Sequence, residues 1–186
     1  MGFGKTFALS LVAFIGLNFI FSILYLALGP GFDELLNRFD PDSGDYAPLM
    51  IIYYLFGSIV SAPYINLNWA ITQPLFNDMA DFLILGLGFI AAPLIAGILA
   101  GKFAESKLQG FAGWLLTSVV STVAVIIGIF LSPTFETELA TTYGPYLSII
   151  PPIDFEVLMI SIIISCVINV VFYGFFALLV AKTEYY

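Results

Sequence analysis

The sequence predicts an all-α integral membrane protein with four transmembrane helices and one re-entrant or interfacial helical segment. Hydrophobic residues make up 61% of the 186 residues and charged residues only 10%, whereas soluble domains are about half apolar and a quarter charged. A bilayer core of ~30 Å is crossed by about 20 apolar residues in a helix. Five stretches without Asp, Glu, Lys or Arg reach that length, at 6–32, 46–77, 82–101, 108–135 and 157–181.

The first helix is expected over residues 6–28. It ends at Gly29-Pro30-Gly31, because proline cannot continue the helical hydrogen bonds and glycine disfavours a helix. An acidic loop follows, in which Asp40, Asp42 and Asp45 lie within six residues. Such oxygen-rich loops suit calcium. The glycine of this loop stands one position too early for a standard calcium loop, so we favour a solvated turn and leave cation binding open.

The second apolar stretch differs from the others. Residues 49–62 are apolar without interruption, but this run is too short for a full span. The next residues, 63–77, mix aromatic, proline and carboxamide side chains, a composition typical of a membrane interface. We therefore predict a re-entrant or surface-lying helix, with a tilted span over 49–72, and hence five full spans, as the alternative. Four carboxamides are candidates for a polar lining: Asn66, Asn68, Gln73 and Asn77.

Three further helices are expected over residues 82–101, 111–132 and 157–181. The first of these is rich in small residues, and Gly86, Gly97 and Gly101 are its candidate helix-packing positions. Small residues let two helix backbones approach closely, which is a main source of helix association in lipid. Proline and acidic residues separate the helices at 132–156.

The sequence also predicts a two-fold repeat of a helical hairpin within one membrane domain, 1–186. Pro30-Gly31-Phe32-Asp33-Glu34-Leu35 is matched by Pro133-Thr134-Phe135-Glu136-Thr137-Glu138-Leu139, and a Tyr-x-Pro follows each. The predicted halves are 1–105 and 106–186. Lys and Arg are retained on the cytoplasmic side of a membrane. In either topology, four of the five basic residues lie inside and one lies outside. The repeat favours four spans, with both acidic loops outside.

Charge is then divided between the two sides of the membrane. In the four-span topology, eleven acids and one arginine face outward and give a net charge of −10. Four lysines and two glutamates face the cytoplasm and give +2, which together account for the net charge of −8. We expect a multi-pass protein of the cell membrane with acidic extracellular loops.

Several classes of function are not expected. The chain has no histidine and one cysteine, Cys166, so the usual haem, zinc and iron–sulfur sites have no ligands. No nucleophile and base can be paired within the apolar stretches, and we predict no catalytic residue, cofactor or metal. Five scattered basic residues cannot form the basic stripe that nucleic acids require.

Two functions remain. In the first, the protein is a non-catalytic subunit that packs into and stabilises a larger membrane protein complex with other integral membrane subunits. In the second, it is a small oligomeric channel or carrier for a neutral solute, because a lining of polar uncharged residues needs no ionisable group at depth. Polar residues within the expected helices could either bond neighbouring helices to one another or line a path for a solute. They are Asn18, Thr117, Ser118, Ser121, Thr122, Ser161, Ser165 and Asn169.

Overall fold

The computed structural model of the chain describes residues 2–29, 31–44, 46–76, 78, 80–143 and 153–181. This part of the chain is built from helices, without a strand. Four of its helices are long and apolar enough to cross a membrane: α1 (Phe3–Leu28), α5 (Asp81–Lys102), α6 (Lys107–Leu131) and α8 (Phe155–Val180). The predicted all-helical class and the four long apolar helices are thereby confirmed. The expected helix ends lie within a few residues of these bounds.

Five shorter elements connect or accompany the long helices. α2 (Phe32–Phe39) follows α1, and α7 (Pro133–Tyr143) follows α6. The second apolar stretch forms α3 (Met50–Phe56), a 3₁₀ turn η1 (Gly57–Ile59) and α4 (Pro63–Phe76). Elements α2 and α7 come from the two acidic segments of the predicted repeat.

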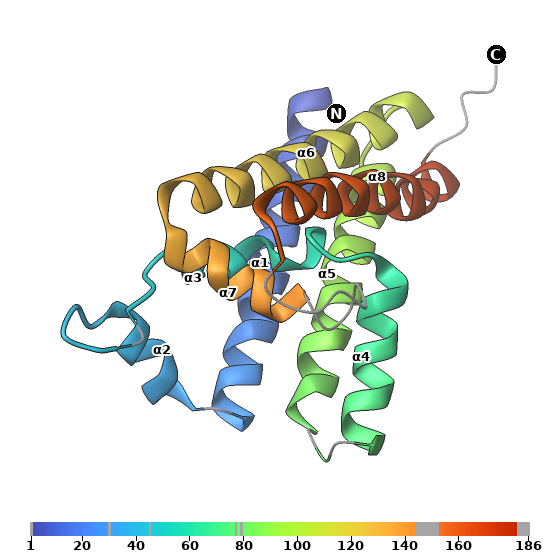
Figure 1. Cartoon of the computed structure of the whole chain (residues 1–186). Helices are drawn as coiled ribbons and strands as arrows, with labels where there is room; N and C mark the ends of the chain where they lie inside the picture. Colours follow the sequence, from blue (N-terminus) through green and yellow to red (C-terminus); the bar gives the residue numbers. More distant parts are fainter. Residues whose placement is uncertain are drawn as a thin grey trace.

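The long helices pack as two pairs. α1 lies along α5, and α6 lies along α8. In Figure 1, α1, α4 and α5 run down the view while α6 and α8 run across it, so the two pairs cross steeply. Contacts between α5 and α8 and between α1 and α6 join the pairs.

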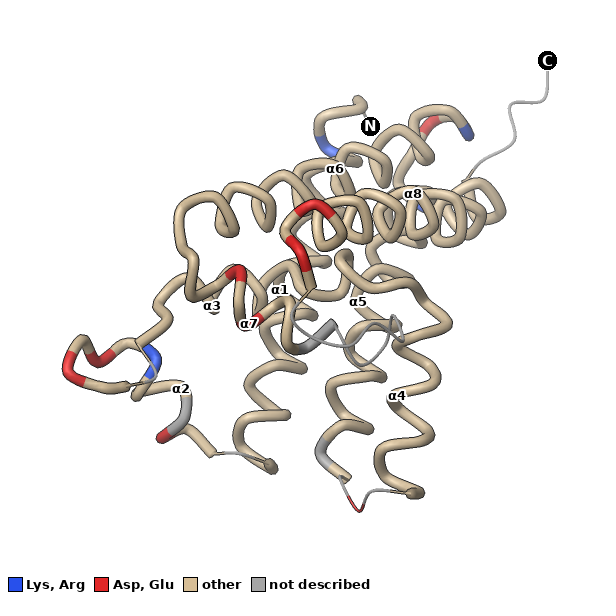
Figure 2. Tube along the Cα trace, in the orientation of Figure 1, with Lys and Arg blue, Asp and Glu red and all other residues tan. Residues whose placement is uncertain are grey.

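The lysine end of the molecule is formed where α1 begins, α5 ends and α6 begins. Lys5 lies in the first turn of α1, Lys102 ends α5 and Lys107 begins α6. These three ends contact one another, because a Cβ on Gly110 of α6 would reach the Cα of Gly101. In the rest of the described chain, acidic residues lie in connections, in the short helices α2 and α7 and in the first turn of α8 (Figure 2). Asp81 begins α5.

The long helices bury small and polar residues and expose large apolar ones. The buried positions of α1 recur every fourth residue: Thr6, Ser10, Phe14, Asn18, Ser22 and Leu26. Residues such as Val12 (70% exposed) and Ile20 (53%) face outward. This distribution suits lipid, in which large apolar side chains are well solvated and helices associate through small and hydrogen-bonding residues.

The second apolar stretch is broken rather than continuous. The axis of Met50–Ile59 and that of Pro63–Phe76 meet at 108°. Pro63 accounts for the break, since it has no backbone N–H and its ring would clash with a carbonyl one turn earlier. The same residue is tolerated at the start of α4, where the first N–H groups have no helical partner. In Figure 1 the lower ends of α1, α4 and α5 lie together, so after α4 the chain has returned to the end at which α1 finishes.

Candidate functional site

A buried polar cluster holds the break between η1 and α4 against α8. The side-chain amide of Asn169 donates to the backbone carbonyls of Ile59 (3.1 Å) and Ser61 (2.9 Å), and to that of Ser165 in its own helix (2.9 Å). The hydroxyl of Ser61 donates to Asn66 Oδ1 at 2.5 Å. Because the break leaves carbonyls without helical partners, these bonds satisfy groups that would otherwise be buried unpaired.

Several polar atoms of the interior have no hydrogen-bond partner in the described chain. Buried polar atoms in proteins are almost always paired, and each exception calls for an explanation. Three of the exceptions lie on the buried face of α1, and three more lie at or beside the break. The atoms are Thr6 Oγ1, Ser10 Oγ, Asn18 Oδ1, Ser58 Oγ, Asn66 Nδ2, Ser118 Oγ, Asn169 Oδ1 and Tyr173 Oη. They combine hydrogen-bonding capacity with the absence of charge.

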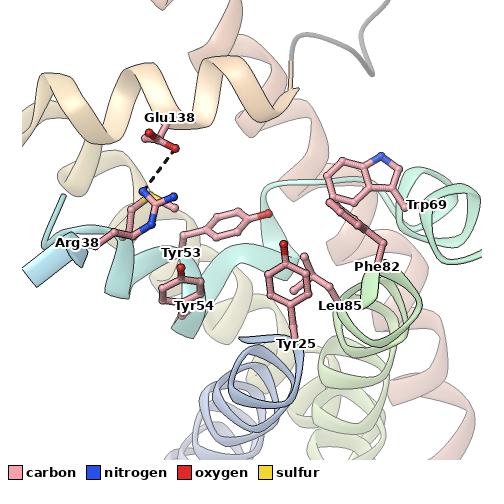
Figure 3. A pocket seen from close by; sticks show the side chains of 9 residues that line it. Tyr25, Arg38, Tyr53, Tyr54, Trp69, Phe82, Leu85 and Glu138 are labelled. Atoms are coloured by element: carbon pink, nitrogen blue, oxygen red, sulfur yellow. Dashed lines mark ion pairs between the residues drawn. The ribbon is translucent and has the colours of Figure 1, made fainter. Parts of the chain in front are cut away.

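An aromatic pocket lies at the opposite end of α1 from the lysine end. Its volume is about 130 Å³, and α1, α2, α3, α4, α5 and α7 all contribute to its wall. In Figure 3 the hydroxyls of Tyr25 and Tyr53 point toward the same central space, between the pair Arg38 and Glu138 on one side and Trp69 with Phe82 on the other. The lining residues are Tyr25, Arg38, Met50, Tyr53, Tyr54, Trp69, Phe82, Leu85 and Glu138.

The aromatic rings of this pocket fix one another edge to face. The Phe82 ring centroid is 5.7 Å from that of Trp69 and 5.8 Å from that of Tyr25. Such pairs contribute about 0.5–1.5 kcal/mol beyond the area they bury. Tyr53 extends the set, with its centroid 5.6 Å from Phe89 of α5. Rings from four different helices are thereby held around one space.

Two backbone contacts position the short helices that carry the pocket. The hydroxyl of Ser22 on α1 donates to the carbonyl of Tyr54 at 3.1 Å, which ties α3 to α1. The N–H of Ala47 donates to the carbonyl of Arg38 at 2.9 Å, which returns the acidic loop to the end of α2. Ser22 therefore links the polar face of α1 to the pocket.

Arg38 and Glu138 form an ion pair across the mouth of the aromatic pocket. The distance from Arg38 Nη1 to Glu138 Oε2 is 3.6 Å, and the two side chains are 14% and 41% exposed. The pair joins α2 to α7, which are the matching acidic segments of the two predicted halves. It places one positive and one negative group side by side against the aromatic rings.

Three of the four predicted lining carboxamides are described, and they differ in burial. Asn66 is buried at the break, where it accepts from Ser61. Asn68 is exposed and Gln73 is half-buried on α4, while Asn77 lies outside the described residues. None of the described three lines the aromatic pocket.

The three glycines predicted for helix packing all contact other helices of the same chain. A Cβ on Gly86 would lie 2.8 Å from Ala70 Cβ of α4, and one on Gly97 would lie 2.9 Å from the Tyr173 carbonyl oxygen of α8. A Cβ on Gly101 would lie still closer to the carbonyl oxygen of Ala177. These glycine positions of α5 are therefore packed against α4 and α8 of the same chain.

The acidic loop contains a local turn. The N–H of Asp42 donates to Asp40 Oδ1 at 3.0 Å, and both residues are exposed. Asp45 lies outside the described residues. Across the described part of the chain, no three His, Cys, Asp or Glu side chains are grouped so that they could hold a metal ion.

Sequence reasoning missed the aromatic pocket and most of the α1 polar face. The aromatic residues of the pocket come from four helices, α1, α3, α4 and α5, so no single spacing along the chain connects them. The polar face of α1 does carry a signal, since Thr6, Ser10, Asn18 and Ser22 recur at multiples of four residues. That spacing places them on one side of a helix.

Comparisons with known proteins give no relative: no family model, no curated protein and no solved structure matches the chain.

Proposed function

We propose that the protein is a non-catalytic membrane channel or carrier that binds a neutral polar solute. The observation that carries this proposal is the buried face of α1, where the side-chain oxygens of Thr6, Ser10 and Asn18 have no hydrogen-bond partner among the described residues. From Thr6 to Ser22 this face covers roughly 24 Å of helix. It begins near the lysine end and ends at Ser22, which bonds the backbone of a pocket residue.

The chemistry of this face favours a solute without net charge. A hydroxyl or carboxamide at depth exchanges hydrogen bonds with a polar solute, whereas an ion would need compensating charges there. The four long helices carry their charged residues only at or near their ends. The proposal assigns no catalytic residue and no cofactor.

The broken segment supports the same proposal. Irregular backbone at membrane depth is tolerated where protein covers it or where it lines a watery cavity. The cluster around Asn169 covers the break of Val60–Ala62, and a cavity of about 110 Å³ adjoins it between Ala62, Ile65 and Ser165. We therefore favour four full spans with α3, η1 and α4 as a re-entrant element.

A flux measurement tests this proposal. Purified protein in liposomes is expected to speed glycerol entry, followed by light scattering, relative to protein-free liposomes. Asn18→Leu, which replaces a fully buried carboxamide of the polar face, should return the rate to that of protein-free liposomes. Val12→Leu, on the exposed side of the same helix, is the matched control and should leave the rate unchanged. Equal rates with and without the wild-type protein would contradict the proposal.

The second candidate is a subunit that stabilises a larger membrane complex. It is supported by the outward face of α8, where large aliphatic residues form an unbroken exposed row: Ile160, Ile163, Ile164, Val167 and Val171. Such a row suits lipid and a partner helix alike. Purification of the chain from its native membrane in mild detergent separates the candidates, because a subunit copurifies with one defined partner in fixed proportion and a homo-oligomer does not.

A further inference from the structure

The lysine end is also the place where one end of each long helix meets the others. A Cβ on Gly101 of α5 would collide with the carbonyl oxygen of Ala177 of α8, and one on Gly110 of α6 would lie 3.0 Å from the Cα of Gly101. One turn further along α6, a Cβ on Gly113 would lie 2.9 Å from Thr6 Cγ2 of α1. The starts of α1 and α6 and the ends of α5 and α8 are therefore held together by close backbone packing.

Each of three helices brings one lysine to this packed end. Lys5 lies in the first turn of α1, Lys102 ends α5 and Lys107 begins α6. All three are exposed, and none of them forms an ion pair with another described residue. Lys5 precedes Thr6 and Lys102 follows Gly101, which are the residues that contact α6. The packing of the helix ends therefore holds three positive charges close to one another, although they repel.

The charge of the lysine end is opposite in sign to that of the whole chain. The chain carries −8, whereas the three lysines and the one acid among them, Glu105, carry +2. The other described basic residue, Arg38, pairs with Glu138 at the opposite end of α1. In Figure 2 the blue segments at the start of α1 and at the connection from α5 to α6 lie at the top of the view, and most red segments lie below or to the left. An anionic group is therefore attracted to this end and repelled elsewhere.

Each of these lysines has an exposed apolar residue beside it. Phe3 (42% exposed) lies in the same turn as the first lysine, and Phe103 (36%) and Leu108 (76%) directly follow the other two. A lysine at the end of a membrane helix extends its charged group toward the headgroups, while apolar side chains remain among the acyl chains. A phospholipid carries a phosphate next to its acyl chains, so it matches both kinds of residue, whereas a phosphate dissolved in water matches only the lysines.

We propose that the lysine end binds the headgroups of anionic phospholipids, with the ammonium groups of Lys5, Lys102 and Lys107 at their phosphates. Basic groups between the ends of membrane helices are known to bind anionic headgroups, and each lysine near the membrane surface strengthens the attraction about fivefold. The bound phosphates offset the repulsion between the lysines. Because the lysines belong to three helices, such lipids also join α1, α5 and α6 and stabilise the folded chain.

The unfolding temperature of the full chain in micelles of a neutral detergent tests the inference. Phosphatidylglycerol added to the micelles should raise this temperature, because a ligand that binds only the folded state stabilises it. The same amount of phosphatidylcholine should raise it less, and added salt should weaken the effect of phosphatidylglycerol by screening the charges. Glycerol phosphate, which has no acyl chains, should have no effect. Equal shifts with the two lipids, or a shift with glycerol phosphate as large as that with phosphatidylglycerol, would overturn the inference.

Variants separate the role of the charges from that of the fold. Lys5→Gln, Lys102→Gln and Lys107→Gln should each raise the phosphatidylglycerol concentration for half of the shift about fivefold. The triple glutamine variant should no longer distinguish the two lipids, whereas the triple arginine variant, which keeps the charges, should respond as the wild type does. Arg38→Gln removes one positive charge at the opposite end of α1 and is the matched control, with no change expected. A triple glutamine variant that still prefers phosphatidylglycerol, or an Arg38→Gln variant that loses as much as a lysine variant, overturns the inference.

Discussion

The side-chain amide of Asn169 donates to the backbone carbonyl of Ser61 at 2.9 Å, across 108 positions of sequence. The same amide reaches the carbonyl of Ile59 at 3.1 Å. One carboxamide in a long, apolar helix thus pairs the free backbone carbonyls at a break in another apolar segment. In a medium without water, the alternative for these carbonyls is to remain unpaired.

Replacement of Asn169 should destabilise the fold. Asn169→Leu removes the amide from two carbonyls at the break, and an unpaired buried carbonyl costs about 1–3 kcal/mol. We expect a loss of roughly 2 kcal/mol in the free energy of unfolding, measured by unfolding in mixed detergent micelles. Asn68→Leu, at an exposed position of α4, is the control and should change stability little. Equal stability of the two variants would show that the break is held by packing alone.

A methyl group at Gly101 should separate α5 from α8. The added Cβ would collide with the backbone carbonyl of Ala177, which cannot rotate away as a side chain can. Overpacking of this kind costs about 1–3 kcal/mol, so Gly101→Ala should lower the unfolding temperature in detergent. Gly16→Ala in α1 meets no atom within 4 Å and should be neutral or slightly stabilising, because alanine favours a helix more than glycine. A stable Gly101→Ala protein would mean that the two helices are farther apart than described.

The ion pair between Arg38 and Glu138 should contribute little to stability. Glu138 is 41% exposed, and pairs accessible to water are typically worth about 0–1 kcal/mol. Arg38→Gln, Glu138→Gln and the double variant, compared by unfolding in detergent, should give a coupling energy below about 1 kcal/mol. A coupling of several kcal/mol would show that the pair holds α2 against α7.

Impermeant labelling should place the two ends of α3, η1 and α4 on one side of the membrane. In a Cys166→Ala background, cysteines introduced at Ser43 and at Asp78 should react from the same side, whereas one at Leu108 should react from the other. Asp78 and Leu108 are exposed and Ser43 is half-buried. This pattern follows from a re-entrant segment that returns the chain to the end at which α1 finishes. Reaction of positions 43 and 78 from opposite sides would instead establish five full spans.

Local composition was sufficient to predict the helices. Whether about 20 residues form a spanning helix depends on their own apolar character, because lipid obliges each segment to satisfy its backbone internally. The short apolar run set the second stretch apart in the same way, although neither the break at Pro63 nor its angle of 108° was predicted. The predicted repeat stays a prediction, although α2 and α7 follow their long helices in the same order and meet through one ion pair.

The candidate sites were predicted less well, and for a physical reason. Asn66 and Gln73 are seven residues apart and lie on one side of α4, with Asn68 on the other, yet only Asn66 is fully buried. Tyr25 is far in sequence from Tyr53 and Tyr54, and it meets them only because α3 packs against α1. Apolar aromatic residues are abundant throughout this chain, with 19 Phe and 10 Tyr, so none of them stands out by composition.

By itself, the sequence determined that this chain is helical, that four of its helices are long and apolar enough to cross a membrane, and that their charged residues lie near their ends. These properties depend on the composition of residues that are neighbours in sequence, and not on which helices pack against them. Only the tertiary structure decided that the glycines of α5 face their own chain, that Asn169 holds the break and that aromatic residues of four helices line a pocket beside an ion pair. Each of these depends on which helix faces which, and in lipid that choice is made by close packing and hydrogen bonds between distant residues rather than by hydrophobicity.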